Sequence, residues 1–192
     1  MKNNSYTIAV LGAGNIGASV IERLLEIDED LIDIEVKKVL VADSSKERSF
    51  DASLLTDSFE DIVQDDSIQL VIEVLGGLEP GKDYIKQLLE SGKSVITANK
   101  DIIADCGKEL IEIAQKNNTC LYFEAAVAAG IPVLKPLIES LRGEEVTRVA
   151  GIINGTSNYI LTSMEEGNTY PSSLAFSKAL LYVSPSSMDV KI

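Results

Sequence analysis

The 192-residue sequence contains no histidine. Histidine is the commonest proton shuttle near neutral pH and a usual ligand of zinc. Its absence leaves Lys, Asp, Glu, Tyr and Cys as the side chains available for acid–base chemistry.

Cysteines and long apolar runs are also scarce. The two cysteines, Cys106 and Cys120, form no CxxC pattern, so we predict two small buried thiols in a reducing cytosol. No stretch approaches the roughly 20 apolar residues of a membrane helix. The apolar stretch near the N-terminus is too brief for a secretory signal. We therefore expect a cytoplasmic protein.

Positive charge is in short supply as well. Seventeen Lys and Arg residues face thirty Asp and Glu residues, which gives a formal net charge of -13. Such a chain repels phosphate backbones and anionic lipid, so we expect neither nucleic acid nor membranes as partners. Apolar residues, in contrast, are plentiful at 45% of the chain, which is enough for a compact core.

Short apolar runs rich in β-forming residues alternate with longer segments of helical period, which is typical of parallel βαβ units. The predicted strands are Tyr6–Leu11, Val36–Val41, Leu70–Leu75, Ser94–Thr97 and Leu121–Phe123. The predicted helices are Ile16–Leu25, Ser58–Val63, Asp83–Leu89 and Gly107–Lys116, with left-handed stops at Gly92 and Asn117–Asn118. The sequence therefore predicts an α/β fold with a doubly wound parallel sheet of the Rossmann type.

The pattern changes after Glu124, and we place a domain boundary near residues 129–132, between domains 1–130 and 131–192. In the second part we predict a helix over Val133–Leu141 and a strand over Val146–Ile153 that begins a second sheet. A further helix is expected from Thr156 or Ser157 towards Glu165, whereas the stretch from Thr169 onward shows no clear periodicity. The second part therefore reads as an incomplete α+β domain.

A glycine motif follows the first predicted strand and opens the first predicted helix, and it reads Gly12-Ala13-Gly14-Asn15-Ile16-Gly17. In this context the first glycine permits a tight turn, the second lets the backbone approach a pyrophosphate, and the third lets the helix pack on the strand. The helix N-terminus adds N–H groups and a positive dipole. The motif predicts that domain 1–130 binds NAD or NADP, although any strand-to-helix turn can be rich in glycine.

Asp43 follows the second predicted strand, where a carboxylate can accept a hydrogen bond from the 2′-hydroxyl of an adenosine ribose. That role favours NAD. Lys46 and Arg48 lie just beyond, and they either hold the 2′-phosphate of NADP or belong to an ordinary solvated loop. The sequence leaves the choice between the two cofactors open.

Two further strand ends carry candidates for the same site. Gly76 and Gly77 follow the third predicted strand and would let the nicotinamide half of the cofactor lie close to the sheet edge, with a simple turn as the alternative. Lys100 follows the next strand at a helix start, where the helix dipole opposes its charge by about 0.3–1 kcal/mol. We expect Lys100 to be partly buried beside the cofactor and to transfer a proton or polarise a substrate. An exposed loop lysine is the alternative.

Five segments, in this order and spacing, resemble homoserine dehydrogenase: VLGAGNIG, EVLGG-x-EP, SVITANKDIIA, YFEAAVAAGIPVLKPL and GIINGTSNYIL. The resemblance runs from about Tyr6 to Met164. It implies an NAD(P)H-dependent oxidoreductase that interconverts L-aspartate 4-semialdehyde and L-homoserine in threonine, methionine and isoleucine biosynthesis. It also implies a homodimer, with residues 131–192 as part of a dimerisation and substrate domain.

The resemblance assigns roles to individual residues. Segment 12–17 would hold the pyrophosphate, Gly76 and Gly77 would lie along the cofactor, and Lys100 would lie beside nicotinamide and substrate. The substrate pocket would use Asn154, Gly155, Thr156, Tyr159 and Asp189. A sodium ion would be bound by Glu124 and the backbone carbonyls of Val127, Ala129 and Ile131. The alternative for the substrate residues is a helix N-cap and a core tyrosine. The alternative for the sodium site is that Glu124 is a hinge glutamate that caps backbone N–H groups.

The sequence departs from the family pattern near its end. Val183 stands where the family has a substrate-binding Glu, Asp189 matches the family's Asp, and the sequence ends at Ile192 before the family's essential lysine. Loss of a well-placed general acid or base costs about 10²–10⁴-fold in rate. We therefore expect dinucleotide binding with poor or no turnover. A non-catalytic, truncated dinucleotide-binding module is the alternative reading.

Overall fold

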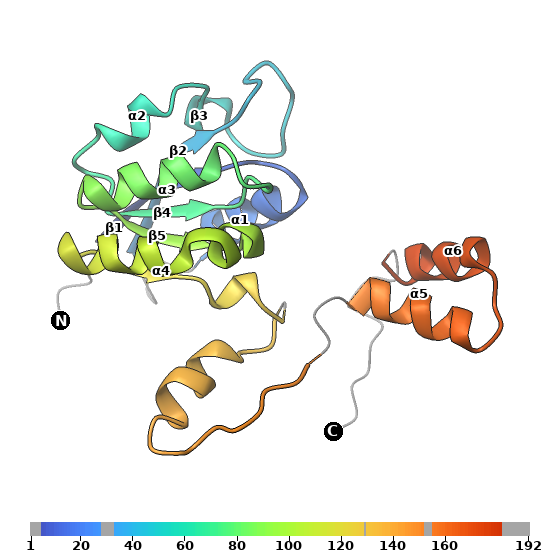
Figure 1. Ribbon diagram of the computed structural model, residues 1–192. Helices are drawn as coiled ribbons and strands as arrows, with labels where there is room; N and C mark the ends of the chain where they lie inside the picture. The colour runs from blue at the N-terminus through green and yellow to red at the C-terminus, as the bar shows by residue number, and fades with distance from the viewer. Residues whose placement is uncertain (1–4, 28–32, 129, 152–154, 182–192) are drawn as a thin grey trace. The chain divides into compact units, whose positions relative to one another are not determined.

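The computed structural model describes residues 5–27, 33–128, 130–151 and 155–181 (Figure 1). The chain forms two compact units, which we call the first unit (Met1–Arg142) and the second unit (Gly143–Ile192). Within the described residues, no helix is long and apolar enough to cross a membrane.

The first unit contains a six-stranded parallel sheet in the order β3-β2-β1-β4-β5-β6. Its strands are β1 (Ser5–Leu11), β2 (Asp33–Leu40), β3 (Leu55–Thr56), β4 (Leu70–Glu73), β5 (Ser94–Thr97) and β6 (Leu121–Tyr122). The predicted doubly wound fold is confirmed, and only the short β3 was not predicted. The strand order reverses between β1 and β4, and ligands of such sheets bind beside this point at the carboxyl ends of the strands.

Helices connect these strands and cover both faces of the sheet. They are α1 (Asn15–Leu25), the 3-10 turn η1 (Ala52–Leu54), α2 (Glu60–Val63), α3 (Gly81–Glu90) and α4 (Lys100–Lys116). In Figure 1, α2, α3 and α4 lie on one face and α1 on the other. The predicted left-handed stops are confirmed, since φ is +86° at Gly92 and +55° at Asn118.

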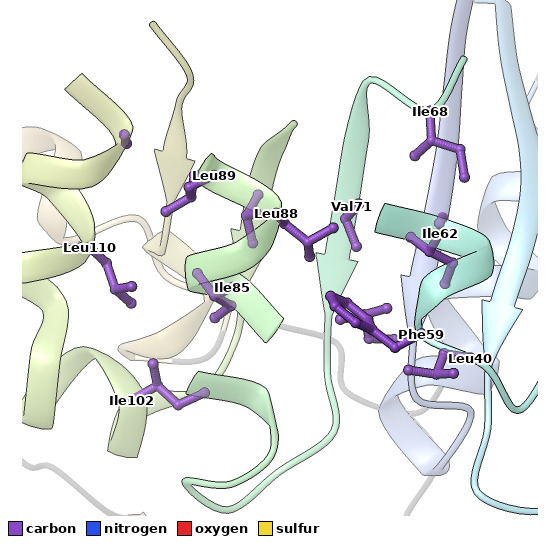
Figure 2. Packing of buried hydrophobic residues seen from close by; sticks show 14 of the residues in the cluster. Leu40, Phe59, Ile62, Ile68, Val71, Ile85, Leu88, Leu89, Ile102 and Leu110 are labelled. Atoms are coloured by element: carbon purple, nitrogen blue, oxygen red, sulfur yellow. The ribbon is translucent and has the colours of Figure 1, made fainter. Parts of the chain in front are cut away.

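The core follows the two-residue alternation of the buried strands. On β1, Ile8 and Val10 point towards α1, whereas Ala9 and Leu11 point towards α2, α3 and α4. Figure 2 shows the second of these clusters, which contains Val71 of β4 together with Phe59 and Ile62, with Ile85, Leu88 and Leu89 of α3, and with Ile102 and Leu110 of α4. Full burial of each such side chain contributes about 1.5–3 kcal/mol. The helices are therefore held by packing, and the strand ends stay in place to carry the site.

The predicted thiols have different surroundings. Cys106 is buried as predicted, and its thiol donates to the carbonyl of Ile102 at 3.3 Å; burial raises the pKa of this thiol. The prediction of a buried Cys120 was wrong, because the residue is exposed. Cys120 precedes β6, which pairs with β5 along only one of its edges, so the sheet covers it from one side only.

After β6 the first unit continues with the 3-10 turn η2 (Glu124–Ala126) and the π-helical turn η3 (Pro136–Ser140), the latter within the predicted helix Val133–Leu141. The predicted strand Val146–Ile153 was wrong over residues 146–151, which have no regular structure; residues 152 and 153 lie outside the described part. A strand needs a neighbouring strand to which it is hydrogen-bonded, and an apolar pattern does not show whether such a neighbour exists. Val149 is accordingly 70% exposed.

The described part of the second unit contains α5 (Gly155–Glu165) and α6 (Tyr170–Leu181). The helix predicted from Thr156 or Ser157 to Glu165 is confirmed, whereas α6 was not predicted. Ser and Pro residues usually interrupt a helix, but here Pro171 and Ser172 lie in the first turn of α6. Thr169 Oγ1 accepts the N–H of Ser172 at 3.4 Å, and Pro171 occupies an early position that needs no N–H acceptor.

Candidate functional site

The glycine turn between β1 and α1 has the geometry that the motif predicted. Gly12 has a φ of +101°, and its N–H donates to the carbonyl of Leu40 at 2.9 Å. A Cβ at Gly12 would lie 2.9 Å from the carbonyl oxygen of Val74, and one at Gly17 would lie 2.1 Å from the carbonyl oxygen of Gly12. A Cβ at Gly14 would meet nothing within 4 Å. The outer two glycines are therefore needed for packing, and the middle one leaves open space beside the backbone.

The N-terminus of α1 faces that open space without a local counter-charge. Gly14 is its N-cap and offers no side-chain hydrogen bond, and the first turn holds no acidic residue. The exposed Ile16 and Asn15 follow in that turn, and Ala13 is half-buried before it. N–H groups and a positive helix end with no carboxylate attached are the standard arrangement for binding a phosphate.

The loop after β2 is organised around Asp43. Its Oδ1 accepts from the hydroxyl of Ser45 at 2.6 Å and from the N–H of Ser45 at 3.0 Å, and these hydrogen bonds lower the pKa of Asp43. Arg48 donates to two carbonyls of its own loop, those of Lys46 at 2.8 Å and Asp43 at 3.0 Å. The carboxylate of Asp43 is thus charged at neutral pH, while the guanidinium of Arg48 is held by the loop backbone.

The remaining cofactor candidates meet in one pocket at the carboxyl ends of β4 and β5. The pocket measures about 160 Å³ and is lined by Ile16, Val74, Gly76, Gly77, Ala98, Asn99, Lys100 and Asp101. Gly76 and Gly77 have φ values of +81° and +73°, and a Cβ on either would meet nothing within 4 Å. The structure therefore brings the glycine turn, the second glycine pair and Lys100 together beside the point where the strand order reverses.

Lys100 is the first residue of α4, as the sequence suggested, but the expected partial burial was wrong. Its side chain is 68% exposed, and its Nζ lies 3.9 Å from Oδ2 of Asp101. Asp101, in the first turn of α4, supplies the negative charge that this helix end favours. Because the ammonium group of Lys100 is exposed at the rim of the pocket, it can contact a ligand without a rearrangement of the surrounding protein.

Three polar residues in or behind this pocket were given no role from the sequence. They are Glu73, Thr97 and Asn99, which are buried at the ends of β4 and β5 and are hydrogen-bonded to one another or to the Gly76–Gly77 loop. Glu73 stands inside an otherwise apolar strand, and a charged residue in such a run was the available signal.

Glu124 functions as an acceptor for backbone groups. Its carboxylate accepts the N–H groups of Val133 at 2.5 Å, Leu134 at 2.9 Å and Lys135 at 2.9 Å. Burial alone raises the pKa of Glu124, but these three donors together with the charge of Lys135 lower it overall. The carboxylate therefore fixes the start of the turn that contains η3.

Glu124 also lines a larger, mostly apolar pocket of about 350 Å³ between β6 and residues 132–139. Of the other predicted cation ligands, Val127 and Ile131 are exposed, and Ala129 lies outside the described residues. Within the described part of the chain, no group of three or more acidic or cysteine side chains gathers as a metal site would require.

The predicted substrate residues belong to the second unit. Gly155 and Thr156 begin α5, and Tyr159 lies half-buried in the same helix. Asn154 and Asp189 lie outside the described residues. The helix N-terminus expected at this segment is confirmed, while the substrate role of these residues stays a prediction.

A parallel sheet with the order 3-2-1-4-5-6 and an open glycine turn at its reversal point define a dinucleotide-binding protein of the doubly wound class. Comparison with known families gives the particular one. The profile described as "Homoserine dehydrogenase, NAD binding domain" matches residues 12–124, and that described as "Homoserine dehydrogenase" matches residues 132–190. The chain belongs to the homoserine dehydrogenase family.

Individual relatives agree with this assignment. The chain is 43% identical over 181 residues to the homoserine dehydrogenase of Mycobacterium tuberculosis and 41% identical over 164 residues to that of Bacillus subtilis. These alignments cover 91% and 82% of this chain, but only 41% and 38% of the relatives. The chain thus spans about two fifths of the length of these relatives.

Solved structures show the same likeness. A homoserine dehydrogenase from Thiobacillus denitrificans has a TM-score of 0.82 at 34% identity, covering 95% of this chain and 44% of that one. A hyperthermophilic archaeal homoserine dehydrogenase in complex with NADPH has a TM-score of 0.74 at 26% identity, covering 95% of this chain and 64% of that one.

Proposed function

We propose that the first unit binds NAD(H) or NADP(H) and supplies the cofactor half of a homoserine dehydrogenase, which interconverts L-aspartate 4-semialdehyde and L-homoserine. The observation that carries this proposal is the glycine turn at the sheet's reversal point. It is crowded where Gly12 and Gly17 pack and open where Gly14 faces solvent. A relative of the same family is described in complex with NADPH, which supports the class of cofactor.

The residues of this site suit each part of a dinucleotide. The N–H groups at the start of α1 would hold the pyrophosphate, Asp43 would lie at the ribose of the adenosine, and the pocket beside Gly76 and Gly77 would take the nicotinamide half. When bound, the reduced nicotinamide supplies the hydride for reduction of an aldehyde.

Lys100 has the chemistry to assist that reduction. An ammonium group at the pocket rim can donate a hydrogen bond to a carbonyl oxygen, and it stabilises the negative charge that grows there as the aldehyde is reduced. With no histidine in the chain, a lysine is among the few groups that can hold a proton at this position.

The remaining parts of the enzyme belong to the same proposal. Residues 131–192 would contribute to dimerisation and to the substrate pocket, through Asn154, Gly155, Thr156, Tyr159 and Asp189. We propose that the protein forms a homodimer and is located in the cytoplasm, as the sequence led us to expect. Sedimentation of the chain at micromolar concentration tests the dimer, since a monomer mass would contradict it.

A sodium ion at Glu124 is a further part of the proposal, with the carbonyls of Val127, Ala129 and Ile131 as the other ligands. The carboxylate already accepts three N–H groups, and its oxygens offer about four acceptor positions, so a cation would share them with the backbone. If sodium binds, replacing NaCl by choline chloride at equal ionic strength lowers the thermal unfolding midpoint of the wild type. The midpoint of Glu124→Gln then stays the same in both salts.

The cofactor proposal is tested by titrating the chain with NADH and NADPH and following nicotinamide fluorescence. Gly14→Val fills the open space beside the backbone, whose φ of -73° and ψ of -165° suit any residue, so folding is preserved. We expect at least about tenfold weaker binding in this variant. Gly143→Val, also at an open glycine, is the matched control. Equal affinity in the wild type and Gly14→Val would overturn the proposal.

A further inference from the structure

Glu73 is an acidic residue with no exposed surface at the end of β4. Its Oε1 accepts the N–H of Leu75 at 2.8 Å, and its Oε2 accepts the hydroxyl of Thr97 at 2.5 Å. Burying a carboxyl group costs free energy even when it is hydrogen-bonded. An apolar residue of similar volume at such a position commonly gives the fold equal or greater stability. The position therefore calls for an explanation beyond the packing of the strand.

The hydrogen bonds of Glu73, Thr97 and Asn99 form a continuous chain. The N–H of Asn99 donates to Oγ1 of Thr97 at 2.9 Å. In this arrangement the hydroxyl of Thr97 accepts from the N–H of Asn99 and donates its own hydrogen to Oε2 of Glu73. The N–H of Leu75 is also an obligatory donor, so Glu73 acts as an acceptor at both of its oxygens. An amide side chain at position 73 cannot reproduce this pattern.

A second connection lies closer to the pocket. Nδ2 of Asn99 donates to the carbonyl of Gly77 at 2.5 Å, while Oδ1 of Asn99 accepts the N–H groups of Asp101 and Ile102 and so caps α4. The loop after β4 and the start of α4 are thus joined twice, at their base by Glu73 with Thr97 and at the rim by Asn99 with Gly77. Both of the joined segments line the pocket.

These connections matter because the loop has little else to hold it. Gly76 and Gly77 have no side chains, adopt positive φ and have open space where a Cβ would stand. A glycine pair in solvent is the most mobile kind of backbone, and ordering it costs about 1–2 kcal/mol per residue. The hydrogen bonds from Asn99 and Glu73 meet this cost before any ligand arrives.

We propose that Glu73, Thr97 and Asn99 are positioning residues for the nicotinamide half of the cofactor. Their hydrogen-bonded chain fixes the Gly76–Gly77 backbone and the first residue of α4, Lys100, relative to each other. This inference rests on the proposed function, in that the pocket takes a nicotinamide dinucleotide. It assigns these three residues no direct contact with the reacting atoms.

Substitutions of nearly equal size separate the connections. Glu73→Gln replaces one of the two acceptor oxygens with an N–H₂ donor, so either the N–H of Leu75 or the hydroxyl of Thr97 loses its acceptor, and Thr97→Val removes the hydroxyl. Asn99→Ser keeps an N-cap acceptor for α4 but is too short to reach Gly77. Thr97→Ser keeps the hydroxyl and is the rescue variant. Thr56→Val is the matched control, because Thr56 is also buried and its hydroxyl bonds Asp61 at 2.6 Å, at the far edge of the sheet.

The measurement is a ratio of two dissociation constants, that of a nicotinamide-free fragment divided by that of the whole dinucleotide. The fragment is ADP-ribose or its 2′-phosphate, and the dinucleotide is NADH or NADPH, whichever the wild-type chain binds more tightly. We expect Glu73→Gln, Thr97→Val and Asn99→Ser to lower this ratio at least about fivefold with fragment binding unchanged. Thr97→Ser and Thr56→Val are expected to stay within about twofold of the wild type.

Each alternative outcome has a distinct meaning. An unchanged ratio in folded Glu73→Gln and Asn99→Ser overturns the inference while leaving the proposed function intact. Equal weakening of fragment and dinucleotide also overturns it, because that pattern shows a general loss of structure. If the wild-type chain binds neither the fragment nor the dinucleotide, the proposed function fails, and the inference fails with it.

Discussion

Gly14 and Gly17 are three positions apart in one turn, and an added methyl group is expected to destabilise the fold at Gly17 but not at Gly14. A Cβ at Gly17 would lie 2.1 Å from the carbonyl oxygen of Gly12, so α1 must move off the sheet. We expect Gly17→Ala to lower the free energy of unfolding by about 1–3 kcal/mol, as overpacking does. Gly14→Ala, whose Cβ meets nothing, is the control. Urea unfolding curves of both variants test this, and equal stability would contradict the crowding.

We expect Asp43 to decide between NAD(H) and NADP(H) at the proposed cofactor site. Hydrogen bonds from Ser45 lower its pKa, so the carboxylate is negatively charged at neutral pH, at the position proposed for the adenosine end of the cofactor. A carboxylate accepts from a ribose hydroxyl and repels a 2′-phosphate. We therefore expect Asp43→Ala to shift the affinity ratio towards NADPH by about tenfold or more, whichever cofactor the wild type prefers.

Fluorescence titration with both dinucleotides measures that ratio. Asp51→Ala is the matched control, because Asp51 also accepts an N–H at the start of a turn and its pKa is also lowered by Ser53, but it begins η1 rather than following β2. A shift of the same size in Asp51→Ala would show that the effect is general electrostatics.

At the scale of elements, local signals predicted most of the first unit. Apolar runs located every strand of the sheet except β3. Helices α3 and α4 end near Gly92 and Asn118, where left-handed residues were expected. The predicted helix Gly107–Lys116 covers only the C-terminal part of α4, which begins at Lys100, where a helix start was expected, and is capped by Asn99. The failures at residues 146–151 and at Glu73 share one cause, since both depend on partners distant in sequence. The pairing of Glu73 with Thr97 spans 24 residues, which no local pattern reports.

The opposite end of the sheet offers a prediction about an element connection. Lys93 is 3% exposed before β5, and its Nζ donates to the carbonyls of Asp65 at 2.7 Å and Ile68 at 3.3 Å, in the turn between α2 and β4. Lys93→Met keeps the apolar stem and removes the ammonium donor from both carbonyls, of which that of Asp65 still accepts the N–H of Ile68 at 3.1 Å. We expect a loss of about 1–3 kcal/mol in the free energy of unfolding. Lys86→Met, which breaks the exposed ion pair with Glu109, is the control and is expected to change little.

At the scale of the whole molecule, acidification acts on the first unit in two opposite ways. Protonation reduces the repulsion within a chain of net charge -13, which favours the folded state. Protonation also competes with specific partners of individual carboxylates. Lys37 and then Ser67 hold the pKa of Asp65 far below its usual 3.8, and Lys86 lowers that of Glu109. Such groups stabilise the fold fully above their unfolded pKa, and the contribution is lost as pH falls towards the folded one.

Asp65→Asn separates the two effects, because the variant lacks the titrating group but keeps nearly the whole charge of the chain. The ion pair joins Asp65 in the turn before β4 to Lys37 in β2, at 2.6 Å. We expect the variant to be less stable than the wild type at pH 7 and the difference to shrink steadily below about pH 4, where the unfolded carboxyl takes up its proton. Urea unfolding at pH 7, 4 and 2.5 measures it, with the exposed neighbour Asp66→Asn as the control. A difference that stays constant across this range would mean that the carboxylate of Asp65 stabilises the fold through its shape and not through its charge.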